Sequence, residues 1–268
     1  MGDPLPGVVP THAAGARGPA GTAPDPRVIV AMGGGGFSME PENPLLDAFV
    51  LDLARASAAR GGRDATRPRV CFLPTASGDA EGYIGIFHEA FDAVAEATEL
   101  ELFRRTVGDV EAFLLGQDAI YVGGGNTENM LAIWALHGGD RALRAAWEAG
   151  VVMAGLSAGS LCWFEAGTTD SYGPDLAILE RGLGFLAGSH CPHYDGEPGR
   201  RPLYQRLIGE GRLPAGYAAD DSAALVFRGT TLVECVSSVP AAACYRVERG
   251  ADGVVRETRL PTRHLGAG

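Results

Sequence analysis

The sequence predicts a three-layer α/β domain with a mostly parallel sheet. Short apolar runs alternate with amphipathic helical segments from residue 27 to about residue 156. These runs are continuously hydrophobic, as is typical of strands that are buried on both faces. Glycine-rich breaks follow the runs, at the ends where right-handed crossovers collect loops and ligands.

The elements expected in this region follow a regular order. Strands are predicted at 27–32, 70–73, 100–103, 119–122 and 151–154, and helices at 44–60, 82–97, 110–115, around 130–134 and at 142–149.

The pattern changes after Ser189. A polar loop rich in glycine, proline and arginine is followed by a predicted helix at 202–208 and several short strands between 223 and 254. We interpret this part as a C-terminal antiparallel extension of the same sheet. Residues 1–26, rich in Gly, Pro and Ala, are expected to form a disordered leader, and 27–268 a single catalytic domain.

Bulk composition limits the partners. The net charge of -11 and the lack of a basic cluster argue against nucleic acid and anionic lipid. The five cysteines form no CxxC pair, which favours free thiols in a reducing compartment. With no signal-peptide pattern and no apolar run of membrane-spanning length, we expect a cytoplasmic protein. A homodimer is the default expectation for its oligomeric state.

Ser157 is the candidate nucleophile. It lies in Gly155-Leu156-Ser157-Ala158-Gly159, directly after a predicted buried strand. Such a tight strand-to-helix turn requires small neighbours and lifts the serine hydroxyl above the sheet edge. The alternative is a glycine–serine turn that only lets strand and helix pack.

A serine hydroxyl needs a base and the base needs an orienting carboxylate. Of the six histidines, His190, His193 and His264 are the candidates, and His193 is preferred because it opens a loop directly after a proline. Asp220 and Asp221 precede a late apolar strand, and either one is a candidate for orienting His193.

The oxyanion hole is expected to use the Ala158 N–H together with an N–H of Gly124 or Gly125. The segment 123–126 lacks the lysine and hydroxyl of a phosphate-binding loop, and 33–36 lacks the downstream acid of a dinucleotide site. No metal site and no cofactor are expected, since no His/Cys/Asp/Glu spacing suits a metal.

Three segments together resemble the peptidase E family: Gly123-Gly124-Gly125-Asn126-Thr127, Gly155-Leu156-Ser157-Ala158-Gly159-Ser160 and Cys191-Pro192-His193-Tyr194. The resemblance implies a flavodoxin-like, class I glutamine amidotransferase-like fold. It also implies a serine peptidase in which Ser157 is the nucleophile, His193 the base and Asp221 the carboxylate. Family members commonly carry glutamate at the last position, so Asp220 stays open as a substitute.

The resemblance also implies a substrate. Peptidase E removes N-terminal aspartate from dipeptides, and basic groups meet the substrate carboxylate. Arg200 or Arg201 matches that role, with Arg201 preferred. Asp170 is the nearest match to an acidic residue after the elbow helix and is assigned to the substrate amino group. Asn126 is included among the substrate-binding residues.

Three other functions stay open. An α/β-hydrolase esterase would use Ser157, Asp221 and His264 in that chain order. A catalytically silent binding protein of the same fold would need none of these groups. A hydrolase of isoaspartyl or cyanophycin-like substrates would use the same catalytic parts as peptidase E.

Overall fold

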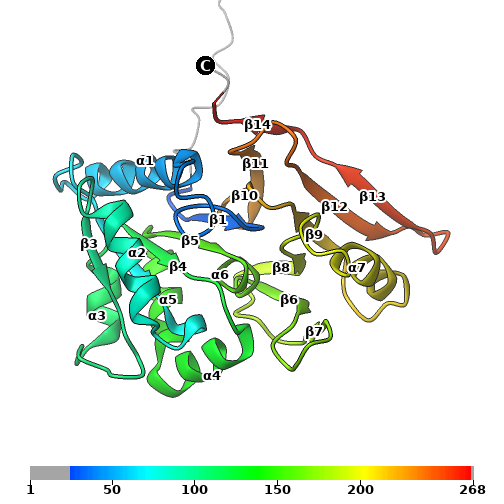
Figure 1. Cartoon of the computed structure of the whole chain (residues 1–268), viewed down its shortest axis with the longest axis horizontal. Helices are drawn as coiled ribbons and strands as arrows, with labels where there is room; N and C mark the ends of the chain where they lie inside the picture. The colour runs from blue at the N-terminus through cyan, green and yellow to red at the C-terminus, as the bar shows by residue number, and fades with distance from the viewer. Residues whose placement is uncertain (1–24, 267–268) are drawn as a thin grey trace, which may run out of the picture.

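Two β-sheets run through the computed structural model, which describes residues 25–266 (Figure 1). Within these residues the larger sheet has eight strands, in the spatial order β14 (Thr262–His264), β11 (Thr231–Ser237), β10 (Ala223–Arg228), β1 (Val28–Met32), β5 (Val152–Leu156), β4 (Ala119–Val122), β2 (Arg69–Leu73) and β3 (Glu96–Glu99). Strands β1, β5, β4, β2 and β3 are parallel, and β10 joins β1 antiparallel. The predicted α/β class with a mostly parallel sheet is confirmed, and it agrees with a flavodoxin-like, class I glutamine amidotransferase-like fold.

Helices cover both faces of the larger sheet because alternate residues of its strands point to opposite sides. Val28, Val30 and Met32 of β1 share one core with α1 (Leu45–Arg60) and α2 (Glu81–Phe91). Ile29 and Ala31 belong to the core on the other face. That face carries η1 (Thr75–Ser77), α3 (Val110–Leu115), α4 (Thr127–His137), α5 (Gly139–Glu148) and α6 (Ala158–Leu161).

The smaller sheet was not predicted. Its six strands within the described residues have the order β13 (Val255–Arg259), β12 (Cys244–Arg249), β9 (Gly216–Ala219), β8 (Leu186–Cys191), β6 (Phe164–Thr169) and β7 (Ala177–Leu179), and α7 (Arg200–Gly209) packs on it. Segments such as Phe-Glu-Ala-Gly-Thr-Thr in β6 combine glycine with polar residues and give a weak strand signal. The predicted antiparallel extension is therefore divided between the two sheets.

One predicted strand was wrong in position. The helix expected to continue to residue 97 ends at Phe91, and the strand expected at 100–103 is instead β3, Glu96–Glu99. This edge strand is polar, so its residues matched the exposed face of a helix. Leu100 and Leu102 are buried in the turn that follows, where the N–H groups of Leu102 and Phe103 donate to Asp79.

The order of the strands decides what surrounds the site. Because β5 lies between β1 and β4, the loops that leave the carboxyl ends of β1 and β4 flank the end of β5, where Ser157 lies. Most of the predicted leader, residues 1–24, lies outside the described residues. All five cysteines are buried free thiols, as expected. Between residues 25 and 266, no helix combines the length and apolarity that crossing a membrane requires.

Candidate active site

Ser157 occupies a strained turn at the end of β5. Its φ of 55° and ψ of -115° lie outside the regions that L-residues prefer. The turn is held by a hydrogen bond from Ser157 N to Met32 O (3.2 Å) and by the Ser160 Oγ, 2.9 Å from Ser157 O. A Cβ on Gly155 would lie 2.3 Å from Gly159 O, and one on Gly159 would lie 2.2 Å from Val122 O. Both flanking glycines are therefore required by close backbone contacts.

His193 and Asp221 meet because their strands are neighbours. β8 and β9 are parallel and paired, so the residues after their carboxyl ends leave the sheet side by side. The His193 Nδ1 lies 2.6 Å from Asp221 Oδ1. Since a carboxylate only accepts hydrogen bonds, Nδ1 carries the proton and Nε2 is left as the basic nitrogen. His193 is 9% exposed, so its ring is held in one orientation.

Two glycines form a cradle around the Asp221 carboxylate. A Cβ built on Gly34 would lie 2.1 Å from Asp221 Oδ1 and 3.0 Å from His193 Cε1. A Cβ on Gly196 would lie 2.1 Å from Asp221 Oδ2. The main chain thus touches the carboxylate from two sides. The glycine-rich segment after β1 contributes to the site by letting this carboxylate come close.

Replacing Gly34 with alanine is expected to lower kcat for peptide hydrolysis about 100-fold, because the methyl group would push Asp221 away from His193. Kinetics and a thermal melt of the same preparation measure the effect. Gly108→Ala is the matched control, since a Cβ there meets nothing within 4 Å. Equal activity of the two variants would contradict the cradle.

Asp220 points away from the histidine. Its Oδ2 accepts hydrogen bonds from Ala243 N (3.0 Å) and Tyr245 Oη (3.1 Å). Burial, together with the neighbouring Asp195, raises the pKa of Asp220 to about 6. Of the two candidate carboxylates, only Asp221 contacts the His193 ring.

The backbone donors near Ser157 differ in what they bind. The Gly124 N–H donates to Tyr83 Oη at 3.1 Å. Among residues 25–266, the N–H groups of Gly125 and Ala158 have no protein acceptor. Gly125 has a φ of +135°, which favours glycine, and a Cβ on it would lie 2.3 Å from Ala76 O. Ala158 and Gly125 are thus the two predicted oxyanion donors whose N–H groups are available.

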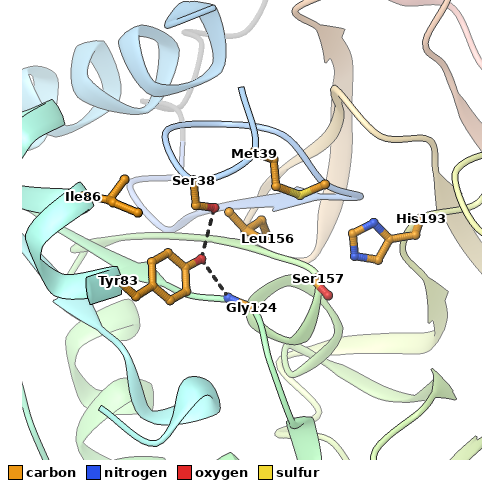
Figure 2. A pocket seen from close by; sticks show the side chains of 8 residues that line it. All are labelled: Ser38, Met39, Tyr83, Ile86, Gly124, Leu156, Ser157 and His193. Carbon is orange, nitrogen blue, oxygen red and sulfur yellow. Dashed lines mark hydrogen bonds between the residues drawn. The ribbon is translucent and has the colours of Figure 1, made fainter. Parts of the chain in front are cut away.

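A cavity of about 410 Å³ opens beside the nucleophile (Figure 2). Ser157 and His193 both line it, at the ends of strands from different sheets. No hydrogen bond joins Ser157 Oγ to the His193 ring in this structure, as is common in enzymes without substrate. The other lining residues are Ser38, Met39, Tyr83, Ile86, Gly124 and Leu156.

The remaining histidine candidates have other partners. His190 is fully buried, with Nδ1 3.1 Å from Tyr217 O and Nε2 3.0 Å from Ser160 Oγ. Burial lowers its pKa to about 3, so His190 is neutral. Its hydrogen bond with Ser160 helps to hold the turn that contains Ser157. His264 lies on β14, at the edge of the larger sheet, with Nε2 3.3 Å from Ser238 O. Neither histidine lines the cavity.

The predicted substrate-binding residues are not brought to the cavity. Asn126 caps α4, with Oδ1 accepting from Asn129 N and Nδ2 donating to Ser171 O. Asp170 is exposed in the turn after β6. Arg201 forms an ion pair with Glu257 and stacks on Tyr194 and Tyr245.

Arg200, the other arginine considered, is also engaged. It is buried, with Nε 2.7 Å from Glu197 Oε2 and Nη1 donating to Thr168 O. Both arginines are engaged in ion pairs, and neither guanidinium group lines the cavity that contains Ser157.

Sequence reasoning missed the cavity wall formed by Ser38, Met39, Tyr83 and Ile86. The glycine-rich segment after β1 was the only signal near Ser38 and Met39. Tyr83 and Ile86 lie in α2 and follow an ordinary amphipathic pattern, so their place in the site depends on how α2 packs.

Comparisons with known proteins show which proteins this chain is similar to. Residues 29–235 match the family model described as peptidase family S51. The chain is 49% identical over 239 residues to the uncharacterized peptidase YgaJ of Bacillus subtilis (strain 168), covering 89% of this chain and 99% of the relative.

Two solved structures share the fold. A peptidase from an acI-B1 actinobacterium has a TM-score of 0.62 at 18% identity, covering 88% of this chain and 94% of its own. A putative peptidase E protein from Listeria monocytogenes EGD-e has a TM-score of 0.50 at 17% identity, covering 88% and 99%.

Proposed function

Since the chain belongs to peptidase family S51 and is a serine-type peptidase, we propose that it hydrolyses small peptides through Ser157, His193 and Asp221. The observation that carries this proposal is the hydrogen bond of 2.6 Å between His193 Nδ1 and Asp221 Oδ1. It orients the ring so that Nε2 is the nitrogen available to act as the base, in the same cavity as the strained serine.

The reaction has two halves. Ser157 Oγ attacks the scissile carbonyl carbon while His193 Nε2 takes the hydroxyl proton. The N–H groups of Ala158 and Gly125 stabilise the negative oxygen of the tetrahedral intermediate. The C–N bond then breaks, and His193 returns the proton to the leaving amine. Water, activated by the same histidine, hydrolyses the acyl-enzyme ester and regenerates Ser157.

Asp221 has two tasks in this scheme. It keeps the His193 ring in the tautomer with the proton on Nδ1, and its negative charge stabilises the imidazolium formed after proton transfer. The side chain is 32% exposed, while Gly34 and Gly196 contact its oxygens. This cradle supports a fixed position for the carboxylate without complete burial.

The substrate is a separate question. The resemblance of this chain to the peptidase E family points to N-terminal aspartyl dipeptides as substrates. Isoaspartyl or cyanophycin-like substrates are the second candidate. The arginine expected to bind the aspartyl carboxylate is paired with Glu257. Aspartyl specificity therefore stays a prediction that rests on the resemblance.

Comparing His193→Ala with His264→Ala tests the proposed mechanism. Loss of His193 is expected to lower kcat by about 10,000-fold or more, because among residues 25–266 no other histidine and no carboxylate lines the cavity that contains Ser157. His264→Ala is expected to keep nearly full activity. A panel of dipeptides with a ninhydrin or chromatographic readout measures both. Loss of activity only in His264→Ala would overturn the proposal and favour the esterase arrangement.

A further inference from the structure

The cavity has two sides with different tasks, provided that the proposed function holds. His193 must donate a proton to the leaving amine, so the leaving residue has to lie on the His193 side of Ser157. The residue that supplies the scissile carbonyl then extends the other way. In Figure 2, Tyr83 and Ile86 lie on that opposite side, and Gly124 lies between them and Ser157.

This opposite side is uncharged. Met39, Ile86 and Leu156 contribute apolar side chains, and Tyr83 contributes an aromatic ring. Within the described part of the chain, residues 25–266, the side-chain hydroxyls there besides Ser157 are those of Tyr83 and Ser38, which hydrogen-bond each other at 3.2 Å. The Tyr83 hydroxyl also accepts the Gly124 N–H, so these polar groups already satisfy one another.

The chain contains no lysine, so arginine is its only strong side-chain cation. No arginine lines the cavity among residues 25–266. An aspartate side chain placed here would lose part of its hydration without gaining a counter-charge, which is unfavourable. An apolar side chain would instead gain from leaving water.

We propose that the cavity on the Tyr83 side of Ser157 binds an uncharged, apolar side chain of the residue that contributes the scissile carbonyl. Met39 and Ile86, at 47% and 42% exposure, form the mouth of this subsite, and Tyr83 and Leu156 form its inner wall. A volume of about 410 Å³ suits residues of the size of leucine, methionine or phenylalanine. The four residues of this subsite therefore determine a preference for peptides with an uncharged side chain at this position.

The first test is a dipeptide series with one common leaving residue, comparing Leu, Met, Phe and Asp at the N-terminal position. The wild-type kcat/KM is expected to be at least about 10-fold higher for the apolar residues than for Asp. A preference for Asp would overturn the subsite and leave the serine mechanism standing. Hydrolysis of no dipeptide would overturn the proposed function, and the subsite with it.

The second test adds a cation. Ile86→Arg is expected to lower kcat/KM for the Leu dipeptide and raise it for the Asp dipeptide, changing their ratio at least about 10-fold. The substitution lies on an exposed part of α2, so the fold should tolerate it. Leu136→Arg on α4 is the matched control, because Leu136 is 75% exposed and outside the cavity. An unchanged ratio in Ile86→Arg would contradict the assignment.

Discussion

Ser157→Ala is expected to lower kcat for peptide hydrolysis about 100,000-fold. The reason is that acyl-enzyme formation needs the Ser157 oxygen. The other hydroxyls that line the cavity among residues 25–266, those of Ser38 and Tyr83, lie on the side away from His193 (Figure 2). Steady-state kinetics on the best dipeptide, with a limit of detection set by a blank, measure the loss.

A matched control and a chemical probe sharpen this experiment. Ser57→Ala removes a hydroxyl from α1 that is bonded to Gly150 O, away from the cavity, and should keep the wild-type rate. A fluorophosphonate should add to the peptide that contains Ser157 in the wild type and not in Ser157→Ala. Wild-type activity in Ser157→Ala would exclude the proposed nucleophile. A catalytically silent binding protein would show no hydrolysis in either form.

Asp221→Asn is expected to lower kcat about 10,000-fold while KM changes little. An asparagine amide carries no charge to stabilise the imidazolium and can hold the ring in the wrong tautomer. The side chain is partly exposed, so the folded structure should keep its thermal stability. Parallel measurement of kcat, KM and the melting temperature distinguishes a loss of chemistry from a loss of fold.

The adjacent residue is the control for this substitution. Asp220→Asn keeps an oxygen that can accept the hydrogen bonds from Ala243 N and Tyr245 Oη, and it leaves the His193–Asp221 pair untouched. Its kcat is expected to stay within a few-fold of the wild type. If Asp220→Asn were the inactive variant and Asp221→Asn the active one, the assignment of the orienting carboxylate would be wrong.

Local patterns predicted the turn around Ser157 and the loop position of His193. Ser157 follows a buried strand and lies in a glycine-flanked turn, and both features are contained in about ten consecutive residues. The turn around His193 was predicted in the same way, from the loop that follows Cys191-Pro192. Such features can be predicted because backbone conformation and the exposure of a loop side chain depend mainly on neighbours in the chain.

The features that the sequence did not predict correctly depend on long-range packing. The predicted strand at 100–103 was displaced because β3 is a polar edge strand whose partner, β2, is more than twenty residues away. Arg201, which was predicted to bind the substrate carboxylate, does not line the cavity. Its guanidinium group is instead paired with Glu257 on β13. A single sequence does not show which distant residue will meet a given side chain.

By itself, the sequence determined the α/β class and predicted the turn at Ser157 and His193 as the candidate base, since each depends on short-range patterns of burial and turn formation. Which of Asp220 and Asp221 contacts His193 depends on the tertiary structure. Consecutive residues point in different directions, and the pairing of β8 with β9 decides which one faces His193. The tertiary structure also decided the cavity wall, because the packing of α2 and of the loop after β1 brings Tyr83 and Ser38 to Gly124, beside Ser157.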